Sequence, residues 1–337
     1  MNNKRLLFFG LMAFLSAAFI SCIKQEEVDR ETVLEATPDP IVAGGWRKMG
    51  GFMNQELSHM DWMFAIGDKA YFSFSYMPDV PWIDLASNFW EYNPATNKFS
   101  PRANIPDFDC CGTMFVINNK GYFKKGDIFI AYDPQSDSWS PQAAMPDTAT
   151  FKFSGGAFSI GNSAYCLGGY NVYDGGLYVD FMYEYQQESN QWIQKEAFGF
   201  WGNHYSTVRR GPYLTIGQKA YEMAISSDLT YYFMAEYDRA TDRYRSLSEC
   251  PFYDLYPGDW GYVLQGRFHV LAGRGSQTDP IQIISYDPET EQWELSDGPP
   301  GGDISLVRDA FSLSNGKAYT VLFNIETKKL DIWEYNP

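Results

Sequence analysis

Charged and aromatic residues occupy the same place before three short apolar runs of this sequence. The pairs are Asp61-Trp62 before Ile66, Asp259-Trp260 before Leu264, and Arg308-Asp309 before Leu313. An ionised carboxylate accepts strong hydrogen bonds from hydroxyl groups, and an indole offers a flat apolar face on which the C–H face of a sugar ring can stack. The pattern therefore favours a site for a hydroxyl-rich ligand, although an aspartate at such a place is equally suited to capping a loop backbone.

Further candidates lie in the long segments between apolar runs. We expect a ligand-binding role for Trp82, Trp201, His204 and Arg209. Arg209, together with Arg210, offers the bidentate contacts that hold an anionic group such as a sugar carboxylate. Paired carboxylates for glycoside hydrolysis stay open, because none of the aspartates in these segments has a diagnostic spacing; they are Asp61, Asp109, Asp254, Asp259 and Asp303.

A repeated phrase indicates the framework that must position these residues. The phrase from Tyr92-Asn93-Pro94 to Phe99 has two aromatics seven residues apart. It returns at Tyr132–Trp139, Tyr185–Trp192, Tyr237–Tyr244 and Tyr286–Trp293, and a sixth copy begins at Tyr335. A period of about 50 residues is typical of a propeller or solenoid. Six tryptophans follow this period and are assigned to packing between repeats: Trp46, Trp90, Trp139, Trp192, Trp293 and Trp333.

Each repeat is expected to supply four strands. An apolar hairpin with a Gly or Asn turn, such as Phe64 to Tyr71, precedes each copy of the phrase, and the Asx-Pro stretch forms a second turn. Four strands in about 50 residues make one propeller blade. The segment Trp46 to Gly50 resembles the second half of the phrase, so we expect this N-terminal strand to complete the blade that contains Tyr335 and to close a ring of six blades.

These motifs resemble kelch repeats of the galactose-oxidase-like β-propellers. The resemblance rests on Tyr165 to Gly169, on Leu271 to Gly273, on the Tyr-Asp-Pro turns and on the tryptophans that follow them. It implies an all-β fold of six degenerate kelch blades over residues 44–337. The copper-binding motif of galactose oxidase has no counterpart in the sequence, so no metal and no cofactor is expected.

Residues 1–21 have the pattern of an export signal. Lys4 and Arg5 precede an apolar run that ends Ser21-Cys22, which resembles a bacterial lipobox. The resemblance implies cleavage before Cys22, lipidation of this cysteine and a tether over residues 22–43. The acidic run Glu26 to Glu31 resembles the tag that sends Bacteroidetes lipoproteins to the cell surface. We therefore expect an outer-membrane lipoprotein that faces either the surface or the periplasm.

Charge and cysteine content limit the function further. Without Lys4 and Arg5, 24 basic residues stand against 42 acidic ones, a net charge of −18, which argues against nucleic-acid binding. No cysteine spacing is typical of a metal site. A disulfide between Cys250 and either Cys110 or Cys111 is left open by the sequence.

Three functions fit these observations. The first is a binding platform for a carbohydrate or a partner protein, which is the usual role of kelch propellers. The second is a sugar-acting enzyme, since the resemblance extends to kelch propellers that are sialic-acid mutarotases or polyuronate lyases. The third is a structural subunit of an outer-membrane complex.

Overall fold

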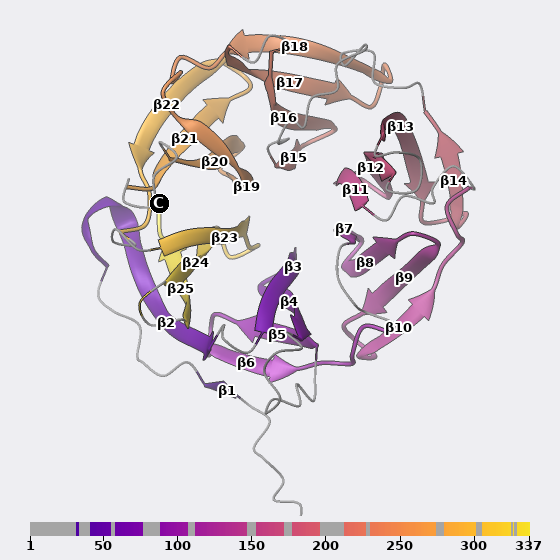
Figure 1. The fold of residues 1–337 in the computed structure, drawn as a ribbon, viewed down its shortest axis with the longest axis horizontal. Coiled ribbons are helices and arrows are strands. Elements are labelled where there is room, and N and C mark those ends of the chain that lie inside the picture. Colours follow the sequence, from indigo (N-terminus) through magenta and orange to yellow (C-terminus); the bar gives the residue numbers. More distant parts are fainter. Residues whose placement is uncertain are drawn as a thin grey trace, which may run out of the picture.

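The computed structural model describes residues 32–33, 41–54, 58–76, 88–106, 112–146, 153–171, 177–195, 212–226, 230–273, 280–300, 305–324, 326 and 329–337. These residues form six four-stranded antiparallel blades arranged in a ring, which is a six-bladed β-propeller (Figure 1). The predicted all-β class and blade number are confirmed. Within the described ranges the only helix is the short 3-10 turn η1 (Ala43–Gly45), and no helix there is long and apolar enough to cross a bilayer.

The blades follow one another along the chain, each running from an inner to an outer strand. Blade 1 consists of β3 (Ser58–Ile66), β4 (Lys69–Tyr76), β5 (Phe89–Asn93) and β6 (Lys98–Pro101), with β1 (Thr32–Val33) paired to β6. Blade 2 consists of β7 (Thr113–Ile117), β8 (Lys120–Lys125), β9 (Ile128–Asp133) and β10 (Ser138–Pro141). Blade 3 consists of β11 (Phe153–Ile160), β12 (Ser163–Asn171), β13 (Leu177–Gln186) and β14 (Gln191–Gln194).

The second half of the ring repeats the pattern. Blade 4 consists of β15 (Tyr213–Ile216), β16 (Lys219–Ile225), β17 (Tyr232–Asp238) and β18 (Arg243–Glu249). Blade 5 consists of β19 (Tyr256–Leu264), β20 (Arg267–Gly273), β21 (Gln282–Asp287) and β22 (Gln292–Asp297). Blade 6 consists of β23 (Ser305–Ser312), β24 (Ala318–Asn324), β25 (Lys329–Tyr335) and β2 (Trp46–Asn54).

The ring closes as the sequence predicts. β2, from the N-terminal side of the chain, pairs with β25 in register Trp46 to Tyr335 and thereby becomes the outer strand of blade 6 (Figure 1). This pairing covers the edge of β25, which would otherwise be open to pairing with another chain.

The repeated tyrosine phrase is a turn held by its own side chains. The Tyr92 hydroxyl donates to Asn97 Oδ1 at 2.9 Å, and Asn93 Oδ1 accepts from the amide of Ala95 at 3.0 Å. Asn97 has a φ of 56°, a left-handed conformation that asparagine and aspartate tolerate better than most side chains. Equivalent tyrosine bonds join Tyr132 to Asp137, Tyr185 to Asn190 and Tyr237 to Asp242. The chemistry of this turn explains why the phrase recurs.

Each junction between neighbouring blades has its own apolar core. One buried cluster of the described residues lies at each of the six junctions, as in that of Phe64 and Tyr71 with Phe123 and Tyr132 between blades 1 and 2. All six tryptophans assigned to packing belong to or pack against these clusters. Stability is therefore distributed over nearest-neighbour contacts, as in other repeat architectures.

A buried glutamate recurs on the third strand of four blades. It is Glu91, Glu184, Glu236 or Glu334, the residue before each phrase tyrosine. Glu236 accepts bonds from the Tyr221 hydroxyl at 3.0 Å, from Lys219 at 2.9 Å and from Arg245 at 2.8 Å. Burial opposes ionisation of Glu236, but the bonds from Arg245, Lys219 and Tyr221 outweigh it and lower the pKa of this carboxyl. We call this arrangement the blade network.

Candidate functional site

The three sequence pairs singled out above lie where three inner strands lose their regular register. β3 shifts between Met60 and Trp62, β19 between Pro257 and Gly261, and β23 between Val307 and Asp309. The shifts fall on Asp61, on the segment 258–260 and on Arg308. A β-bulge re-aims side chains and is over-represented beside functional sites.

The three bulged strands belong to consecutive blades. β19 contacts β23 and β23 contacts β3, so the shifts occupy neighbouring positions around the inner rim of the ring (Figure 1). Because the strands of each blade alternate in direction, these inner strands begin at the end of the ring that carries the connections between blades. We call this end the long-loop face and the opposite end, with the tight strand-to-strand turns, the turn face.

Trp62 is held by a side chain of the neighbouring strand. Its backbone N–H donates to Ser73 Oγ at 3.0 Å, and the Ser73 hydroxyl donates to the Trp62 carbonyl at 3.1 Å. Ser73 is fully buried, so it fixes the backbone where the bulge interrupts the ladder. The indole is half-buried, and its N–H has no partner among the described residues. The Trp62 backbone is thus rigidly held, and its indole N–H is a buried donor without a partner in the described part of the chain.

Trp260 occupies the equivalent strand position in blade 5 but has a different environment. It is half-buried and packs against the core between blades 5 and 6, near Tyr262 and Ala310. A Cβ at Gly258 would approach the Trp260 ring at 3.1 Å, so the bulge and the ring pack closely. This tryptophan therefore has a framework role that the sequence pattern does not show.

Arg308 is a partly desolvated cation at the bulge of blade 6. Its guanidinium lies 5.3 Å from the centre of the Phe323 ring, within the range of a cation–π contact. Its Nε atom is buried without a hydrogen-bond partner among the described residues. Burial lowers the pKa of Arg308, although an arginine remains charged under all ordinary conditions.

Asp309 follows as a carboxyl group in an apolar setting. Its Oδ1 accepts a 2.8 Å hydrogen bond from the amide of Ala310. Burial raises the pKa of Asp309 to about 7, and the Ala310 bond lowers it by less. A carboxyl group that exchanges its proton near neutral pH is the type of group that active sites use as an acid or base.

The rest of the predicted site can be placed only in part. Asp61 and Asp259 lie within β3 and β19, and their strand positions are as described above. Trp82, Trp201, His204 and Arg209 lie outside the described residues, as does the lipidation position Cys22. The structure thus places the strand-borne residues on three neighbouring inner strands. Sequence reasoning missed Ser73, although a serine between Phe72 and Phe74 in an apolar strand is a visible signal.

The described cysteines are buried thiols without a bond to one another. Cys166 and Cys250 are free thiols, and Cys110 and Cys111, the disulfide partners that the sequence left open for Cys250, lie outside the described residues. Burial raises the pKa of Cys166 to about 12 and that of Cys250 to about 11, which keeps both protonated at neutral pH. In the described part of the chain, no three histidine, cysteine or acidic side chains gather as metal ligands would.

Comparison with known proteins supports the architecture. No protein-family model and no curated protein matches the sequence. Among solved structures, that of YjhT is similar over 82% of this chain and 97% of its own, with a TM-score of 0.51 and 13% sequence identity. At this identity the likeness shows a shared fold. Because 502 solved chains match the structure, fold similarity does not distinguish one function from another.

Proposed function

We propose that this protein is a carbohydrate-binding propeller that an acylated Cys22 anchors to the outer membrane. Its ligand face is the long-loop face, where the inner strands of blades 5, 6 and 1 begin. The kelch-type repeats serve as the rigid platform, and the long connections between strands complete the site.

The observation that carries this proposal is the set of three bulges at one register in three adjacent blades. A regular propeller needs no such interruption, and the described inner strand β11 of blade 3 passes through the same register without a shift. The bulged strands carry the residues suited to hydroxyl-rich ligands: a carboxylate, an arginine and tryptophan rings. The indole N–H of Trp62 adds a donor that no described residue uses.

The chemistry of these groups favours a sugar over an apolar peptide. Arg308 and the carboxyl of Asp309 are polar groups in partly desolvated positions, and a ligand with hydroxyl groups offers both donors and acceptors to them. A tryptophan ring in the same ring of strands can stack on the apolar face of a pyranose.

A glycan array tests the proposal. The wild-type protein, produced from residue 44 onward, should bind a limited set of glycans. Trp62→Ala should lose most of this signal, whereas Trp62→Phe should retain much of it because the ring face remains. An array without signal for a well-folded protein would contradict the proposal and favour the structural-subunit function.

A second candidate function rests on Asp309. A carboxyl with a pKa of about 7 on a bulged inner strand favours proton transfer on a bound sugar, as in an epimerisation or lyase reaction. Incubation of array-selected glycans with the protein, followed by NMR, would detect turnover or anomer exchange. Asp309→Asn should abolish such a reaction, whereas glycan binding should persist at reduced affinity. Unchanged glycan spectra with wild-type protein would exclude this second function for those glycans.

A further inference from the structure

Blade 5 departs from the blade network at every strand. Its third strand carries Ser285 in place of the glutamate, its second strand carries His269 in place of the tyrosine, and its fourth strand carries Glu294 where blades 4 and 6 carry arginine. In blade 5 the carboxylate therefore lies on the exposed outer strand and not on the buried third strand. This carboxylate, Glu294, pairs with Arg267 at 2.8 Å.

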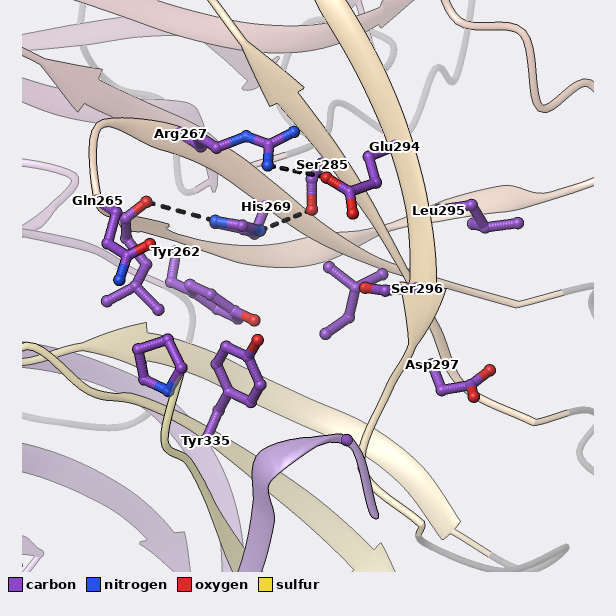
Figure 2. A pocket seen from close by; sticks show the side chains of 14 residues that line it. Tyr262, Gln265, Arg267, His269, Ser285, Glu294, Leu295, Ser296, Asp297 and Tyr335 are labelled. Atoms are coloured by element: carbon purple, nitrogen blue, oxygen red, sulfur yellow. Dashed lines mark hydrogen bonds and ion pairs between the residues drawn. The ribbon is translucent and has the colours of Figure 1, made fainter.

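These exchanges leave a cavity between blades 5 and 6. It has a volume of about 490 Å³ and begins beside the turn between β19 and β20, so it lies toward the turn face of the ring (Figure 2). This volume lies within the range of small-molecule sites. In blade 2, which also lacks the glutamate, Gln187 of blade 3 donates to the Tyr122 hydroxyl at 2.8 Å and supplies the missing partner. Among the described residues, no side chain of a neighbouring blade supplies such a partner in blade 5.

The inner wall of the cavity is an aromatic residue with an unused hydroxyl. Tyr262 is 1% exposed, and its hydroxyl has no hydrogen-bond partner among the described residues. The equivalent residues of the other blades lack a hydroxyl at this position: Phe64, Phe115, Phe158, Leu214 and Phe311. Figure 2 shows the hydroxyls of Tyr262 and Tyr335 pointing toward each other across the cavity. A buried hydroxyl without a partner is costly unless a ligand or water satisfies it.

His269 and Ser285 present a fixed polar edge. His269 Nε2 faces the Leu264 carbonyl at 3.4 Å and so carries the proton, which leaves Nδ1 to accept the Ser285 hydroxyl at 2.7 Å. Burial lowers the pKa of His269 to about 4, so the ring is neutral at physiological pH. Ser285 Oγ retains acceptor capacity toward the cavity.

The remaining charges of the cavity do not suit an anion. Arg267 is neutralised by Glu294, and Figure 2 shows the Asp297 carboxylate pointing away from the cavity. The lining therefore combines hydroxyl groups with the apolar side chains of Leu264 and Ile283. A neutral ligand with several hydroxyl groups and an apolar ring face satisfies all of these groups.

We propose that the cavity between blades 5 and 6 is a second binding site, for a neutral monosaccharide, with Tyr262 and Ser285 as its polar contacts. The site is separate from the long-loop face, and it holds or fails independently of the function proposed above. In blade 5, side chains that suit a ligand thus replace those of the blade network.

Saturation-transfer NMR tests this site with glucose, galactose, mannose and N-acetylglucosamine as probes. The measurements use the Trp62→Ala background, so that stacking at the long-loop face does not contribute. At least one sugar should give a signal. Tyr262→Phe, which introduces the residue found in other blades, should weaken its binding about 3- to 10-fold through the loss of one hydrogen bond.

The decisive variant restores the blade network by combining His269→Tyr, Ser285→Glu and Glu294→Arg. It should fill the cavity and abolish the sugar signal while the protein melts no lower than its parent. An unchanged signal in this variant, or no signal from any of the four sugars in the parent, would overturn the proposal and leave a cavity that holds water only.

If the triple variant does not fold, Tyr262→Phe decides alone, and unchanged affinity there overturns the site. Loss of glycan-array binding in Trp62→Ala with an intact sugar signal would separate the two sites.

Discussion

The ion-pair network at the ring closure should be a large single contribution to stability. Glu334 lies on β25, has a 3% exposed side chain and accepts from Lys317 at 2.9 Å and from the Tyr319 hydroxyl at 3.0 Å. It also pairs with Arg47 of β2, so it joins the N-terminal strand to the C-terminal strands. Glu334→Gln removes the charge but preserves the shape of the side chain.

The expected loss can be estimated from the exposure of the partners. Removal of one partner of a buried ion pair costs about 3–5 kcal/mol. Arg47 and Lys317 are 29% and 30% exposed, so water can partly satisfy them, and the amide keeps one acceptor for Tyr319. We therefore expect a loss of about 2–3 kcal/mol, which lowers the melting temperature by about 3–5 °C in a chain of this size.

The cross-strand row of blade 5 that corresponds to the row of Glu334 provides a matched control. Glu294 pairs with Arg267 but is 59% exposed, so Glu294→Gln should cost less than about 1 kcal/mol. Circular dichroism gives the melting temperatures, and hydrogen exchange of the β2 amides should accelerate in Glu334→Gln only. Equal melting of the two variants, or unchanged exchange of β2, would refute the view that this network closes the ring.

Three further predictions concern the core, the cavity and the anchor. Trp139→Ala should lower stability by about 3–5 kcal/mol in thermal melting, because its indole donates to the Ala103 carbonyl at 2.8 Å and its ring packs on Phe89; a loss below 1 kcal/mol would contradict a core role. Folding favours the neutral form of His269, so the free energy of unfolding should fall by up to about 3 kcal/mol as the pH drops from 6.5 to 4. Urea denaturation of His269→Tyr at both pH values should show that this pH dependence is removed. Cys22→Ala should move the protein from the membrane to the soluble fraction, since acyl chains are its proposed anchor; retention in salt-washed outer membranes would exclude lipidation as the cause.

The architecture was predictable because its signals are local and repeated. The Tyr-Asx-Pro turn requires a particular side chain at each of its positions, as the bond from Tyr92 to Asn97 illustrates, and so the phrase marks one end of every blade. The closing strand was predictable for the same reason, since Trp46 fills the place of a phrase aromatic beside Tyr335.

The candidate sites were less predictable because they depend on strand pairing and on side chains that the other blades have and one blade lacks. The sequence aligned Asp61 with Arg308 but could not show that the register shifts at both. Nor did it reveal that Trp260 packs into a blade junction, which requires the shape of the neighbouring strands. The cavity of blade 5 had a readable signal, because Ser285 replaces the glutamate before a phrase tyrosine, but its consequence appears only when the partner strands are in place.

The most direct test of the central claim is calorimetric titration of the best array glycan into wild-type protein, Trp62→Ala and the variant with a restored blade 5 network. If the long-loop face is the main ligand face, Trp62→Ala should raise the Kd about tenfold, which corresponds to about 1.4 kcal/mol for the lost stacking and burial. The restored-network variant should bind with wild-type affinity, and both variants should remain folded by circular dichroism. A wild-type Kd in Trp62→Ala, or loss of binding only in the restored-network variant, would contradict the claim and place the glycan elsewhere on the ring.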